Sequence, residues 1–350
     1  MTKYKMCYCD FDTCLYRAAK SCQKDFIIVT EKATGTKQRF DGVSKFYGLG
    51  PSKSKGWIGE QNKIRESLGQ PLLTVDDFTI EEHAELADDF DTVIKNAIDQ
   101  LDYAVGRIKR ASEAEDYRLC IGGSANWRYD KAHIKPYKGM RKAKPLLFLE
   151  VKEAFVSKYK NKVIIVDGFE VDDKLGIIGW QNYQNYVKTG VYENILSYVD
   201  KDLLSIISPH FNYDKPEEGI SIPTPTEAAF HFCSQLLSGD KSTDNIQGLP
   251  ALTKEFQEKY GLRKTKGIGK ETAHKILEGL SIKEMFERVV EAYRGYYGDI
   301  KQPFTSFRGE VFQWNYLDYL KENALLLWMQ RYDGQLYDIE DTLKLLKIEY

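Results

Sequence analysis

Short apolar runs alternate with longer segments of helical periodicity through the first 200 residues of the chain. The apolar runs predict strands, and positions such as Phe90, Val93, Ile94 and Ala97 form one apolar stripe at helical spacing. Strands that alternate with helices indicate an α/β fold built on a parallel sheet, which places its sites beyond the carboxyl ends of the strands. The predicted strands are residues 4–9, 117–122, 163–166 and 195–199, with a hairpin at 26–30 and 37–41, and the predicted helices are 12–22, 88–111, 146–158 and 170–187.

The pattern changes near residue 223, where helical segments replace the strands. Thr224-Pro225-Thr226-Glu227 predicts a capping box with proline in the first turn, followed by a helix to Ser238. We therefore divide the chain into an α/β domain, residues 1–223, and a helical region, residues 224–350. Further helices are predicted at residues 270–279, 281–294 and 310–331.

The composition is that of an ordinary globular protein of 350 residues, a length that predicts about two domains. Charges nearly cancel, because 50 Lys and Arg stand against 52 Asp and Glu to give −2, which argues against a wholly basic nucleic-acid coat protein. The six cysteines form no CxxC pair, and the sequence shows neither a signal-peptide core nor a membrane span. We expect reduced thiols and a cytoplasmic protein, located in the host cytoplasm if a bacteriophage encodes it.

Residues 124–145 concentrate positive charge and aromatic side chains directly after a predicted strand. Seven basic residues stand against Asp130 alone, so this basic segment carries a net charge of +6. Cations can contact phosphates while aromatic faces stack on bases, as proteins that bind single strands require. A solvated, lysine-rich loop is the alternative, which the position at a strand end disfavours. The basic residues are Arg128, Lys131, Lys135, Lys138, Arg141, Lys142 and Lys144, and the aromatic residues are Trp127, Tyr129 and Tyr137.

Acidic clusters recur where predicted strands end or helices begin. One such cluster is what helix caps and surface acids produce by chance, but four in these positions indicate a shared site. Two carboxylates about 4 Å apart repel by about 4 kcal/mol at an effective dielectric of about 20, so eight converge only with bound cations or shifted pKa values. Oxygen ligands without clustered His or Cys favour two Mg²⁺ or Mn²⁺ ions, an arrangement that hydrolyses phosphodiesters. The candidate metal ligands are Asp10, Glu170, Asp172, Asp173, Asp200, Asp202, Asp240 and Asp244.

A glycine-rich turn opens a predicted helix at residues 267–277. Glycines let the backbone approach a ligand closely, and the free N–H groups at a helix start can bind phosphate. A plain helix-start turn is the alternative. The candidate contacts are Gly267, Gly269 and Lys270.

Together these motifs resemble the flap endonuclease (5′-nuclease) family, particularly the bacteriophage-type 5′→3′ exonucleases. The resemblance covers most of residues 4–22 and 117–280, and it depends on an ordered set of motifs rather than on any one of them. The matching segments are Asp10, Asn126-Trp127-Arg128, Tyr137-Lys138-Gly139-Met140-Arg141, Glu170-Val171-Asp172-Asp173, Ser197 with Asp200-Lys201-Asp202, Gly239-Asp240 with Asp244-Asn245-Ile246, and Gly267-Ile268-Gly269-Lys270.

The resemblance implies a PIN-like α/β fold, with a mostly parallel central sheet flanked by helices and a C-terminal helix–three-turn–helix element near residues 239–280. It implies a monomeric enzyme without a membrane partner, which hydrolyses DNA at 5′ ends or flaps during replication and takes RNA–DNA hybrids as a further substrate. Lys138 and Arg141 would act on the reacting phosphate, the eight acids would hold two Mg²⁺ or Mn²⁺ ions, and the glycine turn would hold duplex backbone and a K⁺ ion. The implied DNA contacts are Arg128, Lys131, Lys135, Tyr137, Lys142, Gly267, Gly269 and Lys270.

Two features depart from the family pattern. The second strand ends in Cys120-Ile121-Gly122-Gly123, where the family carries an aspartate, and Asp12 is the candidate replacement. The aspartates of the fourth motif, Asp240 and Asp244, are four residues apart instead of three.

Two other functions compete with this hypothesis. Asp10-Phe11-Asp12-Thr13 and Gly239-Asp240 also resemble motifs of haloacid-dehalogenase-type phosphatases, which carry the later motif after an apolar strand. The helical pattern of residues 228–237 argues against a phosphatase, which would also leave the basic segment unexplained. The second alternative, suggested by Gly123, is an inactive nuclease-fold protein that binds DNA.

Overall fold

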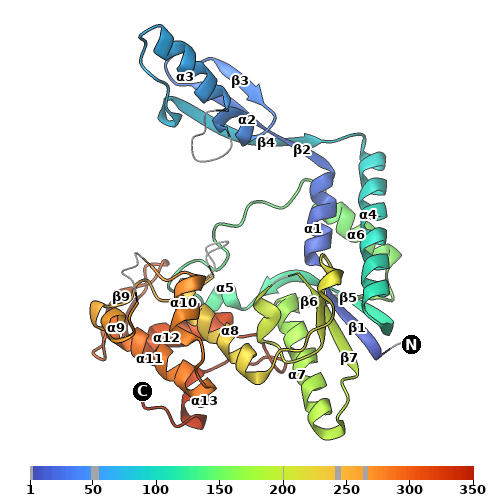
Figure 1. Ribbon diagram of the computed structural model, residues 1–350. Helices are drawn as coiled ribbons and strands as arrows, with labels where there is room; N and C mark the ends of the chain where they lie inside the picture. The colour runs from blue at the N-terminus through green and yellow to red at the C-terminus, as the bar shows by residue number, and fades with distance from the viewer. Residues whose placement is uncertain (1–2, 49–54, 200, 241–245, 263–266) are drawn as a thin grey trace. The chain divides into compact units, whose positions relative to one another are not determined.

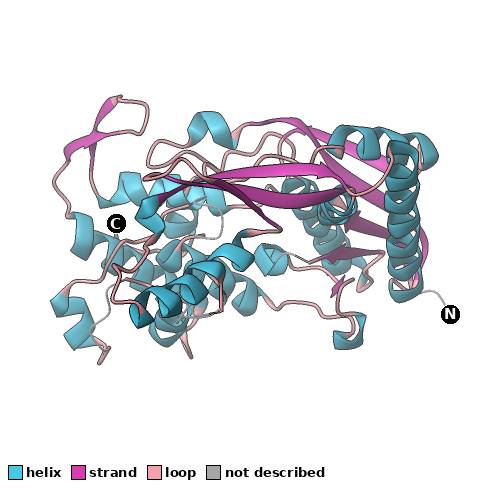
Figure 2. Ribbon diagram, turned by 90° about the horizontal axis from the view of Figure 1, so that it is seen from above, coloured by secondary structure: helices cyan, strands magenta, loops and turns pink. Residues whose placement is uncertain are grey.

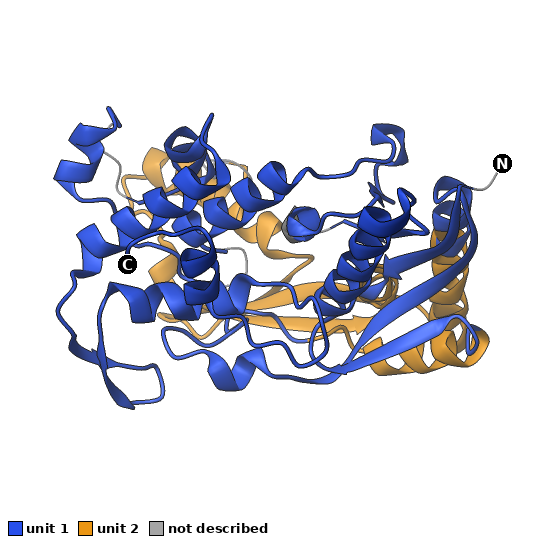
Figure 3. Ribbon diagram, turned by 90° about the horizontal axis from the view of Figure 1, so that it is seen from below, with its two compact units in different colours: residues 1–13, 105–143, 159–350 blue, residues 14–104, 144–158 orange. Residues whose placement is uncertain are grey.

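The chain divides into two compact units in a computed structural model that describes residues 3–48, 55–199, 201–240, 246–262 and 267–350. Unit 1 comprises residues 1–13, 105–143 and 159–350, drawn blue in Figure 3, and unit 2 comprises residues 14–104 and 144–158, drawn orange. The predicted boundary near residue 223 lies inside unit 1, where the sheet and the C-terminal helices form one compact body.

Unit 1 is built on a five-stranded sheet in which all neighbouring strands are parallel (Figures 1 and 2). Cys7 and Cys9 on β1 (Tyr4–Asp10) and Leu119 on β5 (Ala114–Asn126) are fully buried, because the central strands of a parallel sheet are covered on their faces. The prediction of an α/β fold with a parallel central sheet is confirmed. The strand order is β6 (Val163–Gly168), β5 (Ala114–Asn126), β1 (Tyr4–Asp10), β7 (Asn194–Tyr198) and β8 (His210–Asn212).

Helix α7 (Val171–Thr189) packs across the middle strands of this sheet. Its residues Val171, Leu175 and Ile178 join the buried core beneath it. Gly179 permits the close approach of the chain that follows β7, because a Cβ at this position would lie only 2.2 Å from Cγ2 of Ile206. This contact helps to fix α7, whose N-cap and first turn carry three predicted metal ligands, relative to the sheet.

Unit 2 contains an antiparallel three-stranded sheet with a small apolar core of its own. Strand β2 (Gln23–Glu31) pairs with β3 (Lys37–Phe40), which confirms the predicted hairpin, and also with β4 (Phe78–Leu86), which the sequence pattern did not reveal. Along β4 only Phe78 is buried, so the strand lacks the alternation that would have marked it. The elements are β2 (Gln23–Glu31), β3 (Lys37–Phe40), α2 (Val43–Tyr47), α3 (Trp57–Ser67), η1 (Val75–Asp77), β4 (Phe78–Leu86) and α6 (Phe148–Lys158), while α1 (Asp12–Ser21) and α4 (Phe90–Ala111) are shared between the units.

Helices form the C-terminal part of unit 1 around one apolar core. The predicted capping box is present, with Glu227 N–H donating to Thr224 Oγ1 at 3.2 Å and Thr224 N–H donating to Glu227 Oε2 at 2.8 Å. The predicted helix at 310–331 is wrong at its start, where residues 311–314 form a strand because Phe312 and Trp314 pack on Phe304. The elements are α8 (Pro225–Ser238), α9 (Lys254–Lys259), α10 (Lys270–Leu277), α11 (Ile282–Tyr297), β9 (Gln302–Thr305), β10 (Val311–Trp314), α12 (Tyr316–Leu327) and α13 (Ile339–Leu345), with short helices α5 (Arg128–Lys131), η2 (Lys201–Ser205) and η3 (Pro216–Glu218) earlier in the chain.

The cysteines and the helices also bear on the environment of the protein. All six cysteines are buried free thiols. Among the described residues, no helix combines the length and the apolar character that crossing a membrane requires.

A half-buried histidine in α8 predicts a pH dependence of stability. Burial, together with the charge of Lys270, lowers the pKa of His231 to about 4, and its buried Nε2 has no hydrogen-bond partner in the described part of the chain. The unfolded chain binds a proton there near pH 6.5, so this stabilising contribution is complete above about pH 6.5 and is lost as the pH falls toward 4. Between pH 6.5 and 4.5, the free energy of unfolding measured in urea should fall by about 2 kcal/mol less for His231→Phe than for wild type. Parallel pH profiles of the two proteins would contradict the assignment.

Candidate functional site

Two aspartates lie where β1 ends at the carboxyl edge of the sheet. Asp10 is only 8% exposed, and its Oδ1 accepts a hydrogen bond from the backbone N–H of Asp12 at 3.0 Å. Asp12 accepts in turn from the N–H of Gly122 on β5 at 2.9 Å. Burial, with the negative charges of Asp10 and Asp12, raises the pKa of the Cys120 thiol to about 12. The two carboxylates therefore gather over the ends of β1 and β5.

Paired glycines near the end of β5 leave room for carboxylates from neighbouring segments. A Cβ on Gly122 would lie 2.9 Å from Oδ2 of Asp12, and a Cβ on Gly123 would lie 2.3 Å from Oδ1 of Asp167. Asp167 accepts hydrogen bonds from the backbone N–H groups of Ser124, at 2.8 Å, and Ala125, at 3.0 Å. These bonds hold the pKa of Asp167 below its usual range. The space of the side chain missing at position 123 thus contains an ionised carboxylate from β6. In the sequence, only the Asp-Gly pair at the end of a predicted strand marked Asp167.

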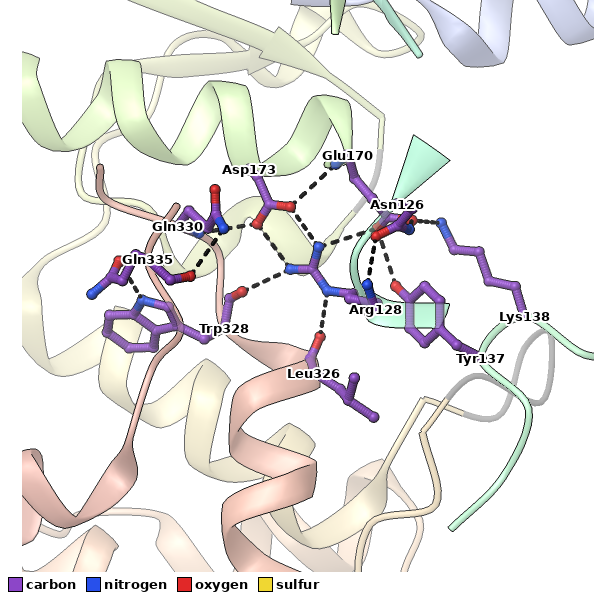
Figure 4. A network of polar contacts seen from close by, with 10 residues as sticks. All are labelled: Asn126, Arg128, Tyr137, Lys138, Glu170, Asp173, Leu326, Trp328, Gln330 and Gln335. Atoms are coloured by element: carbon purple, nitrogen blue, oxygen red, sulfur yellow. Dashed lines mark hydrogen bonds and ion pairs between the residues drawn. The ribbon is translucent and has the colours of Figure 1, made fainter. Parts of the chain in front are cut away.

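Glu170, immediately before α7, collects three donors from the basic segment (Figure 4). Asn126 Nδ2 donates to its Oε1 at 2.8 Å, the Tyr137 hydroxyl donates to Oε2 at 3.0 Å, and Lys138 Nζ forms an ion pair with Oε1. Burial alone would raise the pKa of Glu170, but the charges of Lys138 and Arg128 and the hydrogen bonds outweigh burial and hold it below the usual range. The structure thus brings together residues predicted separately as catalytic, DNA-binding and metal-binding.

Lys138 has an unfavourable backbone conformation in this arrangement. Its φ of 56° is left-handed, a conformation that non-glycine residues adopt rarely. The side chain is nonetheless largely enclosed, with 12% of its surface exposed, and its ammonium group faces Glu170. The ion pair therefore holds Lys138 against the start of α7.

A buried ion pair joins the basic segment to α7. Arg128 and Asp173 are both 0% exposed, and two contacts link them, Nη1–Oδ2 at 2.5 Å and Nη2–Oδ1 at 2.8 Å. Arg128 also donates to the carbonyl oxygens of Leu326 and Trp328, and Asp173 accepts from the N–H of Gln330. This placement differs from the predicted roles, because a guanidinium without exposed surface presents nothing to a phosphate and both oxygens of Asp173 already accept hydrogen bonds.

Asp172 and Asp240 are the other predicted ligands with described side chains. Asp172 lies in the first turn of α7, beside Asp173, and its charge adds to burial in raising the pKa of Tyr198 at the end of β7. Asp240 is half-buried, and its backbone pairs with Ile246. It follows helix α8 rather than the apolar strand that a phosphatase would carry there. Asp200 and Asp244 lie outside the described residues, as does the side chain of Asp202.

The described residues do not by themselves complete a metal centre. Among them, no group of three or more His, Cys, Asp or Glu side chains is placed to hold an ion. The donors at the edge, Asp10, Asp12 and Asp172, offer carboxylate oxygens, which suit a hard cation such as Mg²⁺ better than Zn²⁺. The donor chemistry fits the expected metals, and three further predicted ligands, Asp200, Asp244 and the side chain of Asp202, lie outside the described part of the chain.

The start of the basic segment is anchored on the C-terminal helices. The carboxylate of Glu322 on α12 accepts hydrogen bonds from the N–H groups of His133 and Ile134, at 3.0 and 2.7 Å. Arg308, between β9 and β10, donates to the carbonyl oxygen of Ala132 at 2.7 Å. The segment is therefore fixed at its start, and several of its later cations face outward. Lys131, Arg141 and Lys142 are exposed, and Lys135 is half-buried.

The glycine turn begins a helix, as predicted. Gly269 is the N-cap of α10, and the neighbouring Ile268 is buried in the C-terminal core. Gly269 and Lys270 are exposed and Gly267 is half-buried, so an anion can approach the first turn of α10.

Comparisons with known proteins find a likeness among solved structures. No family model matches the chain, and no curated protein matches it. Among solved structures, the T5 D15 protein co-crystallised with metal ions is similar with a TM-score of 0.30 and 13% sequence identity, over 58% of this chain and 81% of that one. A likeness at this level leaves the assignment of function to the residues of the site.

Breaking the Arg128–Asp173 pair from one side should destabilise the protein. Asp173→Asn leaves a buried guanidinium without its counter-charge, which should lower the free energy of unfolding by about 3–5 kcal/mol. Urea unfolding followed by circular dichroism measures this loss. As a control, Glu218→Gln removes one partner of the exposed Lys215–Glu218 pair and should leave stability nearly unchanged. Equal stability of Asp173→Asn and wild type would show that the pair does not hold unit 1 together.

Proposed function

We propose that this chain is a metal-dependent nuclease that hydrolyses phosphodiester bonds at DNA 5′ ends, as a 5′→3′ exonuclease or flap endonuclease. One observation carries the proposal: the basic segment is anchored against the carboxylate edge of the sheet, where Lys138 and Tyr137 meet Glu170. A cationic, aromatic segment beside clustered carboxylates offers contacts to a nucleic-acid strand and ligands to a metal ion at one place. RNA–DNA hybrids present the same 5′ phosphodiester chemistry, and we include them as candidate substrates.

Carboxylates at the ends of β1 and β7 and in the first turn of α7 would hold the metal, Mg²⁺ or Mn²⁺. A bound divalent ion lowers the pKa of a water molecule and offsets negative charge on the phosphate. Glu170 and Asp173 support this set by fixing Lys138 and Arg128. The proposed ligands of a first ion are Asp10, Asp172, Asp200 and Asp202, and those of a second ion are Asp240 and Asp244.

Lys138 and Arg141 are the proposed cations for the reacting phosphate. Lys138 already lies at the carboxylate edge, and Arg141 is exposed three residues later. Fixed positive groups aimed at developing negative charge are worth more in a partly dehydrated site than in water. The side chain of Lys138 would exchange its contact with Glu170 for the phosphate when DNA binds.

The glycine turn is the proposed contact for the duplex part of the substrate. The first turn of α10 can donate backbone hydrogen bonds to a phosphate, and Lys270 adds a positive charge beside it. A K⁺ ion at this turn is the corresponding cofactor proposal. These contacts would orient the duplex while the 5′ strand runs along the basic segment.

Loss of one carboxylate should separate cleavage from DNA binding. With a 5′-labelled flap substrate, wild type should cleave in Mg²⁺ and not in EDTA, and Asp172→Asn should lower the single-turnover rate by about 100-fold or more. Its affinity for the same DNA in EDTA should be equal or slightly higher, because a negative charge is removed. Asp341→Asn, an exposed acid in α13, is the matched control and should cleave as wild type does. Metal-independent cleavage, or none by wild type, would refute the proposal.

Removal of the ammonium group at the edge should slow the chemistry more than it weakens binding. We expect Lys138→Met to lower the single-turnover rate by about 100- to 1,000-fold at saturating DNA, with at most a small change in Kd. Lys188→Met, at the exposed end of α7, provides a control that removes the same charge elsewhere in unit 1. An unchanged rate for Lys138→Met would remove this residue from the mechanism.

A further inference from the structure

A guanidinium group in unit 1 lies close to two indole rings. The Cζ atom of Arg331 lies 4.4 Å from the ring centroid of Trp180 and 4.3 Å from that of Trp328. Trp180 belongs to α7, Trp328 is the C-cap of α12, and Arg331 follows three residues later. The planar group therefore makes two cation–π contacts, and its N–H groups are what it can offer to a hydrogen-bond acceptor.

The charge of Arg331 has no counter-charge in the described part of the chain. No acceptor there receives a hydrogen bond from its guanidinium, and the groups that act on it electrostatically are two tyrosines rather than acids. Burial lowers the pKa of Arg331 as a result. A half-buried cation without an anion is costly, so a ligand that brings a carboxylate or phosphate would be stabilised here.

A small recess lies beside the stacked guanidinium. Its volume is about 20 Å³, room for little more than one water-sized group, which excludes a nucleobase. Gly176 makes the recess possible, because a Cβ there would lie 2.6 Å from the carbonyl oxygen of Gln330 and would push the segment after α12 away. Besides the stacked residues, the recess is lined by Gly176, Ser205, Ile206, Ile207 and Met329.

The surrounding surface distinguishes between two kinds of anionic ligand. Residues 176–187 of α7 contain no charged residue, although 29% of the chain is charged. Tyr183 packs beside Trp180 at 5.7 Å between centroids, and Tyr186 and Val187 are exposed farther along the helix. Surfaces that bind nucleic-acid backbone carry many cations, whereas the centres of protein interfaces are rich in Trp, Tyr, Met and Arg and poor in Lys and Glu. The composition favours a protein partner.

We propose that Trp180, Trp328 and Arg331 form a docking site for a partner protein's peptide segment in which a carboxylate adjoins an apolar side chain. The carboxylate bonds to the N–H edge of Arg331, and the apolar side chain lies on Ile207 and Met329. The site is separate from the carboxylate edge at Asp10, and the inference does not depend on the proposed nuclease activity.

An array of immobilised ten-residue peptides with randomised central positions tests the proposal. The full-length protein is applied in EDTA, and the Kd of the peptide selected is then measured in solution by fluorescence anisotropy. Sequences with Asp or Glu next to an apolar residue should be selected. Arg331→Gln should raise the Kd by about tenfold or more, since a hydrogen-bonded charge is lost. The Kd of Arg331→Lys should lie between those of wild type and Arg331→Gln, because lysine keeps the charge and loses the stacking on the indole rings.

Control measurements separate the possible outcomes. Arg110→Gln, an exposed arginine in α4, should bind the peptide as wild type does, and urea unfolding checks that each variant is folded. Selection of peptides without acidic residues, or an unchanged Kd for Arg331→Gln, would overturn the proposal. If Arg331→Gln bound labelled duplex DNA more weakly while its peptide binding stayed unchanged, the site would be assigned to nucleic acid instead. If Arg331→Gln lost a self-association that the wild-type protein shows, the site would be assigned to a second copy of the chain.

Discussion

The buried pair of Arg128 and Asp173 is the interaction on which the arrangement of unit 1 depends. It joins the start of the basic segment, the first turn of α7 and the segment that follows α12, which are distant in sequence. Two charges removed from water are tolerated only when their hydrogen-bonding groups are satisfied, and here carbonyl oxygens and a backbone N–H complete the set. The pair therefore fixes one geometry: if any of the three segments moved away, it would leave a buried charge uncompensated.

The contacts of the basic segment become less buried along its length. Arg128 is fully buried and hydrogen-bonded to a carboxylate and two carbonyl oxygens, whereas Lys138, ten residues later, keeps part of its surface exposed and pairs with Glu170. Ion pairs at the margin of the solvent exchange partners at low cost, and fully buried pairs do not. The segment is thus fixed at its start and can rearrange near Lys138 and Arg141, where a phosphate would arrive.

Sequence periodicity was sufficient for the parallel sheet and for the capping box at Thr224, because both depend on local patterns of burial and hydrogen bonding. It failed for β4 and for β10, whose pairing depends on partners elsewhere in the chain. At the site, the acidic residues could be predicted from the sequence because they follow strand ends, but the residues that pair with them could not be predicted. Nothing in a local pattern tells that Arg128 is buried against Asp173, since that contact is set by packing between segments 45 residues apart.

The charge balance of the site differs from the one that the sequence suggested. Glu170 and Asp173 each have a cation from the basic segment as partner, so two of the eight acidic residues expected to repel one another are balanced within the chain itself. The repulsion that opposes their convergence is correspondingly smaller. The same two pairs engage Arg128 and Lys138, which are two of the seven basic residues of the segment. Two of the cations that appeared to be available for DNA thus help to hold the acidic edge together before any ligand binds.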